Sequence, residues 1–167
     1  MRPILSTLLG GALLALAAPA QAQAQEATFD SPSLVPELAV KAARKAVEAC
    51  RERDAQVTAA VVDGGGNTQA LMRDRYAGPH TVETAISKAW TAVSFRTDTL
   101  ELRDVTTPGE DGYGIQHLPD VTILGGGKQI TTDGRTVGGI GVSGAPSGKI
   151  DDECATAGIE AIRKDLL

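Results

Sequence analysis

Two glycine turns between strand-like segments restrict the fold more than any other feature of the sequence. Residues 63–67 read Asp-Gly-Gly-Gly-Asn and separate two short runs that are rich in β-branched and aliphatic residues. Asp133-Gly134 is a second strong hairpin signal. Such turns need the positive φ angles that glycine adopts easily, so each one predicts a pair of antiparallel neighbours. The strands expected are residues 57–62, 68–72, 121–124, 129–131 and 135–142.

Helical periodicity separates these strands. Apolar residues recur at helical spacing over 34–53, and again after a helix start near 79–81. A short helix is expected at 99–103, and a final helix over 151–164 has acids at its start and bases at its end. Residues 106–119 have no period and are expected to form a long loop. The order of elements contains no βαβ alternation, which favours an α+β fold with an antiparallel sheet.

Two packing expectations follow from the same patterns. The strand at 136–142 is rich in glycine, which indicates close approach by another backbone or by a ligand. The helix that begins near residue 80 is expected to have one apolar face and one polar face. Its apolar face comprises Val82, Ala85, Ile86, Ala89 and Val93, and its polar face comprises Glu83, Thr84, Ser87 and Lys88.

The first 24 residues have the features of an export signal. A basic start is followed by the apolar run 4–18, and residues 20–24 contain two overlapping Ala-Gln-Ala cleavage patterns. The apolar run is too short to span a bilayer comfortably, so no membrane anchor is expected. We therefore expect a periplasmic or secreted protein with a flexible lead-in at 25–33 and one domain at 34–167.

Composition narrows the choice of partners and of pocket. The formal net charge is −5 and no run of Lys or Arg is present, which disfavours nucleic acid and anionic lipid as partners. One Trp, two Tyr and two Phe leave the core to small aliphatic side chains. A large pocket inside one subunit is therefore harder to form than one at an interface between subunits.

The two cysteines, Cys50 and Cys154, fall in separate predicted helices. In an oxidising compartment they can form a disulfide, but each also lies on an apolar face where a buried free thiol is common. Neither a covalent haem attachment motif nor a zinc-binding spacing of Cys and His is present in the sequence.

Three ordered blocks resemble the haem-binding GlcG/HbpS family. They are residues 59–67, the stretch 77–90 with its Ala-Gly-Pro-His-Thr start, and the glycine strand 138–144 with the acidic helix start after it. The resemblance covers about 34–167. It implies a profilin-like three-layer α/β/α domain with a five-stranded antiparallel sheet, and assembly into homo-oligomers. Many relatives have a histidine after the Asp-Gly-Gly turn, whereas this chain has Asn67.

A haem site needs an axial donor, an apolar slot and cations for the propionates. His80 can supply the donor, with Tyr76 as an alternative oxygen ligand, and Arg73 and Arg75 are close enough in sequence to hold carboxylates. His117 lies in the long loop and can reach a ligand, including one on a neighbouring subunit. The alternative is that His80 only decorates a helix start and the arginines are solvated or paired with a neighbouring acid.

The expected function is therefore periplasmic binding of haem or a similar tetrapyrrole, for uptake, storage or sensing. One alternative is an accessory protein or enzyme that acts on a small carboxylic acid such as glycolate, held by Arg73 and Arg75. Another is an oligomeric scaffold. No catalytic residue is predicted, because residues 141–145 lack the last glycine of a nucleophile elbow. Asp151 and Asp152 are left as a remote option for an acid/base pair, because adjacent positions point apart on a helix.

Overall fold

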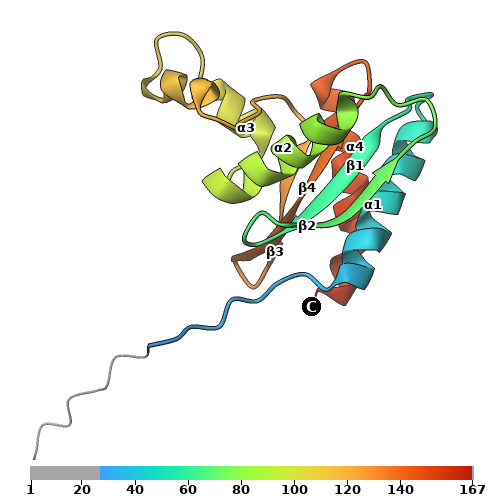
Figure 1. Cartoon of the computed structure of the whole chain (residues 1–167), viewed down its shortest axis with the longest axis horizontal. Coiled ribbons are helices and arrows are strands. Elements are labelled where there is room, and N and C mark those ends of the chain that lie inside the picture. The colour runs from blue at the N-terminus through green and yellow to red at the C-terminus, as the bar shows by residue number, and fades with distance from the viewer. Residues whose placement is uncertain (1–26, 167) are drawn as a thin grey trace, which may run out of the picture. The chain divides into compact units, whose positions relative to one another are not determined.

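The computed structural model describes residues 27–166, and all its helices and strands lie in one compact unit, Ser31–Leu167. The expected signal peptide lies outside the described residues. Four strands form one antiparallel sheet in the order β2-β1-β4-β3 (Figure 1). The elements in chain order are α1 (Pro36–Arg51), β1 (Thr58–Asp63), β2 (Thr68–Arg73), α2 (Thr81–Phe95), α3 (Thr99–Asp104), η1 (Asp111–His117), β3 (Gly127–Thr132), β4 (Arg135–Ser143), α4 (Gly148–Glu160) and η2 (Arg163–Asp165).

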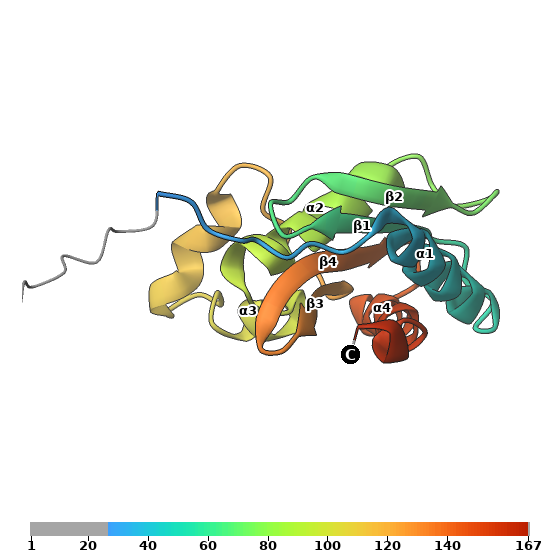
Figure 2. The same cartoon turned by 90° about the horizontal axis from the view of Figure 1, so that it is seen from below.

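The sheet is the middle of three layers, with α1 and α4 on one face and α2 on the other (Figures 1 and 2). Successive side chains of a strand point to opposite faces, so β1 packs against helices on both faces of the sheet. Ala59 and Val61 belong to the core shared with α1 and α4, whereas Val62 packs with Ala89 and Val93 of α2. The expected antiparallel α+β arrangement is confirmed. Within residues 27–166, none of the helices combines the length and apolar character needed to cross a bilayer.

The described part of the chain has four strands, so the expectation of five is wrong. The missing strand is 121–124, which is irregular in the structure. Its Thr122 backbone N–H donates to the hydroxyl of Thr91 on α2, at 3.0 Å, rather than to a neighbouring strand. Gly126 then turns the chain with a φ of +109°, so that β3 begins only at Gly127. A short apolar run can thus be held by a helix side chain as well as by a sheet.

Glycines in β4 let α2 lie directly on the strand. A Cβ added at Gly141 would be 1.9 Å from the carbonyl oxygen of Ala85, and one at Gly139 would be 2.8 Å from that of Ala89. Side chains do not tolerate contacts this short, so only glycine permits this approach. The glycine-rich strand was expected to have another backbone or a ligand close to it, and the structure places the backbone of α2 there.

Small residues and a disulfide join α1 to α4. A Cβ on Gly158 of α4 would be 2.7 Å from the carbonyl oxygen of Ala42 on α1, so the two helix backbones nearly touch. Cys50 and Cys154 form a disulfide between the same helices, with their Cα atoms 5.5 Å apart. Of the two states open to these cysteines, the structure has the disulfide.

Candidate functional site

A pocket of about 510 Å³ opens at the N-terminal end of α2, a volume typical of small-molecule sites. His80, which directly precedes α2, and Tyr76 from the β2–α2 loop line this pocket, and both side chains are exposed. Residues 143–148, which connect β4 to α4, form another wall, and the exposed Leu124 also lines the pocket. The scarcity of aromatic residues indicated that a pocket within one subunit is harder to form than one between subunits, yet residues of one chain line this pocket.

Two buried charges, Lys88 and Asp151, line the deep part of this pocket, which we call the floor. Lys88 Nζ donates to Asp151 Oδ2 and to the carbonyl oxygen of Val142, both at 2.8 Å. Asp151 Oδ1 accepts a hydrogen bond from the backbone N–H of Ala145 at 3.0 Å. The pair therefore ties α2, the end of β4 and the start of α4 together.

Burial acts on both partners of this pair. Burial lowers the pKa of Lys88, and the attraction of the Asp151 carboxylate opposes this effect without cancelling it. Burial also raises the pKa of Asp151, against the ammonium of Lys88 and the backbone N–H groups that it accepts from. In each case the charged form is disfavoured relative to water, which is characteristic of functional sites and also of structural ion pairs.

The expectation that Lys88 lies on the polar face of its helix is wrong, because its side chain is 2% exposed. The face of α2 that packs on the glycine strand consists mainly of small residues, including Ala85 and Ala92. Lys88 lies three residues after the first of these and four before the second, so it belongs to the same face. The small residues three positions before and four positions after Lys88 are the sequence signal that it lies on the buried face. Hydropathy alone assigns a lysine to the polar face.

The start of α4 explains how Asp151 reaches Lys88. The helix begins at Gly148, three residues earlier than expected, and the hydroxyl of Ser147 caps it by accepting from the backbone N–H of Ile150. Asp151 then lies inside the first turn instead of at its boundary. The expected divergence of the two acids is confirmed, since Asp152 Oδ2 accepts instead from Lys128 Nζ at 3.2 Å.

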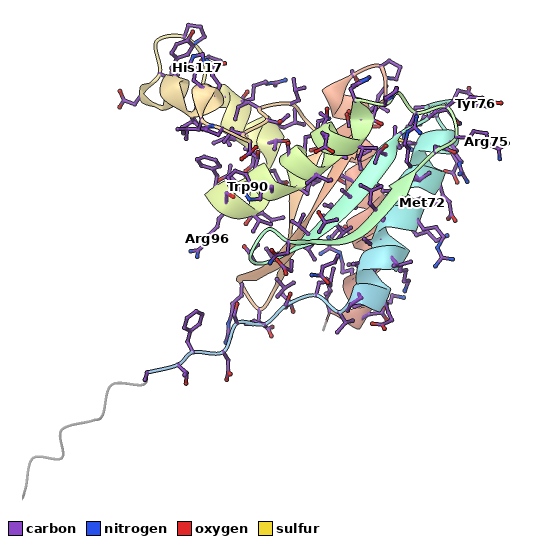
Figure 3. All side chains as sticks on the ribbon, viewed as in Figure 1. Met72, Arg75, Tyr76, Trp90, Arg96 and His117 are labelled. Atoms are coloured by element: carbon purple, nitrogen blue, oxygen red, sulfur yellow. A yellow bond between two sulfur atoms is a disulfide. The ribbon has the colours of Figure 1, made fainter. Side chains whose placement is uncertain are left out.

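Of the five residues proposed from the sequence, His80 and Tyr76 line the pocket, whereas Arg73 and Arg75 do not. Arg73 donates to the carbonyl oxygen of Ala77 and so supports the β2–α2 loop. Arg75 is exposed near Tyr76 (Figure 3). The expectation that both arginines hold a carboxylate at this site therefore has no contact in its favour.

His117, the fifth proposed residue, lies at the end of η1. Its ring packs edge-on against Tyr113, with ring centroids 5.4 Å apart. Figure 3 shows it on the opposite side of the molecule from Tyr76 and Arg75. One chain therefore cannot bring both histidines to a single ligand, and His117 can act at this pocket only from a neighbouring copy.

The turn at residues 63–67 lies at the end of β1 that is farther from this pocket. Its Asn67 is hydrogen-bonded to Asp63 through both its backbone N–H, at 2.8 Å, and its side-chain amide. Trp90 of α2 packs against Gly66 of this turn. In this chain, hydrogen bonds between Asp63 and Asn67 and packing against Trp90 thus stabilise the turn.

Comparisons with a family model and with solved structures agree on one family. A family model described as haem degrading protein HbpS-like matches residues 34–160. A double mutant of HbpS from Streptomyces reticuli superposes with a TM-score of 0.77 and is 40% identical, over 88% of this chain and 98% of that chain. The crystal structure of a PduOC:heme complex has a TM-score of 0.74 at 36% identity, over 78% of this chain and 95% of that chain.

Two further relatives also match this chain. The corrinoid adenosyltransferase PduO of Salmonella typhimurium is 39% identical over 121 residues, which are 71% of this chain but 36% of PduO. Protein GlcG of Escherichia coli K12 is 30% identical over 96 residues, which are 58% of this chain and 70% of GlcG. The chain thus spans about a third of the length of PduO. With the family model covering most of its length, the chain belongs to the GlcG/HbpS family, as the blocks in its sequence predicted.

Proposed function

We propose that this protein binds haem, or a tetrapyrrole of similar shape, in the pocket at the N-terminal end of α2. One observation carries the proposal: two side chains that can ligate iron, His80 and Tyr76, are exposed and line the same pocket. Two relatives support it by their names, an HbpS protein of a family described as haem degrading and the PduOC:heme complex.

The residues of the pocket fit such a ligand. Haem iron supplies a coordination position for a nitrogen or oxygen donor. His80 and Tyr76 form the exposed edge of the pocket, which we call the rim. His80 would offer its imidazole from there, and Tyr76 would offer either its phenol oxygen or an aromatic face. Leu124, Ala145 and Pro146 add apolar surface to the same pocket. Arg75 does not line the pocket, but it is exposed one residue before Tyr76, so we assign it to a ligand carboxylate that extends beyond the pocket.

We also infer that the protein is exported and acts in haem uptake, storage or sensing outside the cytoplasm. The export pattern of residues 1–24 supports this inference. The disulfide between Cys50 and Cys154 supports it independently, since disulfides persist mainly in oxidising compartments. Fractionation of cells that produce the full chain tests export, and N-terminal sequencing of the product tests cleavage of the signal at residues 1–24.

Self-association is the third part of the proposal. β2 is an edge strand, and an apolar groove of about 420 Å³ lies between it and α1. Leu71 and Val40 line this groove and are 41% and 50% exposed. Exposed apolar groups beside an unpaired strand edge favour pairing with a second copy. Leu71→Lys should lower the mass measured by light scattering, whereas Val105→Lys, at a similarly exposed apolar site, should leave it unchanged.

Hemin titration tests the ligand, and the two histidines provide a matched pair of variants. The wild type should develop a saturable Soret band. His80→Ala should shift or weaken this band, while His117→Ala should leave it as in the wild type. Tyr76→Phe, which keeps the ring and removes the oxygen donor, separates the two candidate ligands. A wild-type spectrum that is unchanged by stoichiometric hemin would overturn the proposal, and a loss confined to His117→Ala would transfer the site to η1.

A further inference from the structure

The imidazole of His80 lies directly against the backbone of Gly78, two residues earlier. A Cβ added at Gly78 would be 2.7 Å from Cε1 of the ring and 2.9 Å from Nδ1, but 3.8 Å from Nε2. In proteins a Cβ essentially never lies within 3.0 Å of a non-bonded heavy atom. Any side chain at position 78 would therefore push the ring out of this place. Nε2 is the ring nitrogen that lies farther from Gly78, and both residues line the pocket.

The backbone itself does not require a glycine at position 78. The φ angle of Gly78 lies outside the left-handed region, so an L-residue could adopt the same conformation. The atoms that a Cβ would meet belong to the tip of an exposed side chain, which can turn away. At Gly141, by contrast, a Cβ would meet the backbone of α2. The absence of a side chain at Gly78 therefore makes room for the histidine ring, whereas the absence of one at Gly141 makes room for a helix.

Buried hydroxyl groups fix Gly78 on the sheet. The hydroxyl of Thr81 donates to the carbonyl oxygen of Gly78 at 2.6 Å, and the backbone N–H of Thr81 donates to the same oxygen at 3.0 Å. Since a hydroxyl has one hydrogen, the 2.7 Å bond between the buried hydroxyls of Thr58 and Thr81 is donated by Thr58 of β1. The carbonyl oxygen of His80 accepts from the hydroxyl of Thr84 at 2.8 Å. The backbone on each side of the contact is thus anchored, and the ring has a fixed surface to pack on.

We propose that Gly78 is a positioning residue for haem binding: its bare Cα lets the imidazole of His80 lie at the pocket wall, with Nε2 as the nitrogen that meets the iron. This inference rests on the ligand role proposed for His80 and adds the feature that orients it. A ligand that is already oriented loses less entropy on binding, and groups that orient metal ligands typically change metal affinity by about tenfold or more. A methyl group at position 78 would remove this orientation without removing the imidazole.

The position of the ring can be tested in the protein without hemin. The chain has two histidines, so its proton NMR spectrum has two Hε1 signals, and that of His117 is an internal reference. In the wild type, the Hε1 proton of His80 should show a nuclear Overhauser effect to the Hα protons of Gly78. Gly78→Ala should shift the ring signals of His80 and leave those of His117 unchanged. The unfolding temperature of this variant should stay at the wild-type value, because the ring can move aside.

Hemin titration then measures the effect of the ring position on affinity. Gly78→Ala should bind hemin about tenfold more weakly than the wild type does, with a shifted Soret band. Gly114→Ala, at a glycine of η1 whose Cβ would have no atom within 4 Å, is the matched control and should bind as the wild type does. If Gly78 acts only through His80, the double variant Gly78→Ala/His80→Ala should bind hemin as His80→Ala does. A methyl group that merely narrowed the pocket would weaken the double variant further.

Three results would overturn the positioning role of Gly78. They are unchanged His80 ring signals in Gly78→Ala, wild-type hemin affinity in Gly78→Ala, and losses of binding free energy that add up in the double variant. A wild type that binds no hemin would instead overturn the ligand role of His80, and this inference with it. The two kinds of failure are distinguishable, because the first leaves the Soret band of the wild type intact.

Discussion

Asp151→Asn should destabilise the protein more than most single substitutions would. The change keeps the size of the side chain but leaves the ammonium of Lys88 buried without its counter-charge, and the lysine is 2% exposed. Removing one partner of a buried ion pair costs about 3–5 kcal/mol. This loss is a large share of the roughly 5–15 kcal/mol by which domains are stable. Lys88→Met should cost a similar amount because it leaves the carboxylate unpaired.

The pH dependence of the two variants should have opposite signs. In Asp151→Asn the pKa of Lys88, already lowered by burial, loses its main raising influence and falls further below the unfolded value. The folded state then binds fewer protons than the unfolded state, so the loss of stability shrinks as pH rises from about 7 towards about 10. In Lys88→Met the pKa of Asp151 rises further above its unfolded value. The loss of stability then shrinks as pH falls from about 7 towards about 5.

The double variant Lys88→Met/Asp151→Leu isolates the net contribution of the pair. In the wild type the pKa of Lys88 is lowered and that of Asp151 is raised, so the fold disfavours both charges. Replacing both charges by apolar groups of similar size removes this cost. The double variant should therefore be about as stable as the wild type, or more stable.

Urea denaturation followed by circular dichroism, at several pH values, measures all these differences. The reasoning would be refuted if Asp151→Asn lost less than about 1 kcal/mol, because the pair would then behave like an exposed one. It would also fail if the two single variants showed the same pH slope. A third contradictory result is a double variant whose loss equals the sum of the single losses.

Three further predictions concern packing, cross-linking and a second ion pair. Gly141→Ala should lower the unfolding temperature strongly or prevent folding, because its Cβ would meet an α2 carbonyl oxygen at 1.9 Å; Gly114→Ala, with no atom within 4 Å, should not, as thermal melts would show. Reducing the disulfide between α1 and α4 should cost about 2–5 kcal/mol, measured by urea denaturation with and without reductant. Arg51 holds the pKa of Asp74 below its ordinary value, so their pair stabilises the fold at neutral pH and this contribution should disappear on acidification; the acid denaturation of Asp74→Asn should lack that step.

Local signals were sufficient to predict most of the fold. The Asp-Gly turns fix β1 with β2 and β3 with β4, because a tight turn leaves the strands little choice of partner. Helical periodicity locates α1, α2 and α3 to within a few residues of their observed bounds. The strand predicted at 121–124 failed because the backbone N–H of Thr122 donates to Thr91, about 30 positions earlier on α2, rather than to a neighbouring strand. Non-local partners of this kind leave no trace in a hydropathy pattern.

The site was predictable at its rim but not at its floor. His80 and Tyr76 lie beside a helix start, where turn residues and a change of period mark the chain. Lys88 and Asp151 are 63 residues apart and meet only because glycines in β4 let α2 approach the sheet. A buried lysine contradicts the ordinary rule for charged residues, and only the partner it finds in the folded chain makes its position tolerable.

The link between α1 and α4 also has a consequence for proteolysis. Its two cysteines are 104 residues apart, and the mostly exposed stretch from Thr107 to Pro119 lies between them. A protease that cleaves this stretch would therefore produce two fragments that remain covalently joined. The nicked protein would migrate as one chain without reductant and as two pieces with it. Cleavage and dissociation are thus separate events in this molecule, and an oxidising environment delays the second.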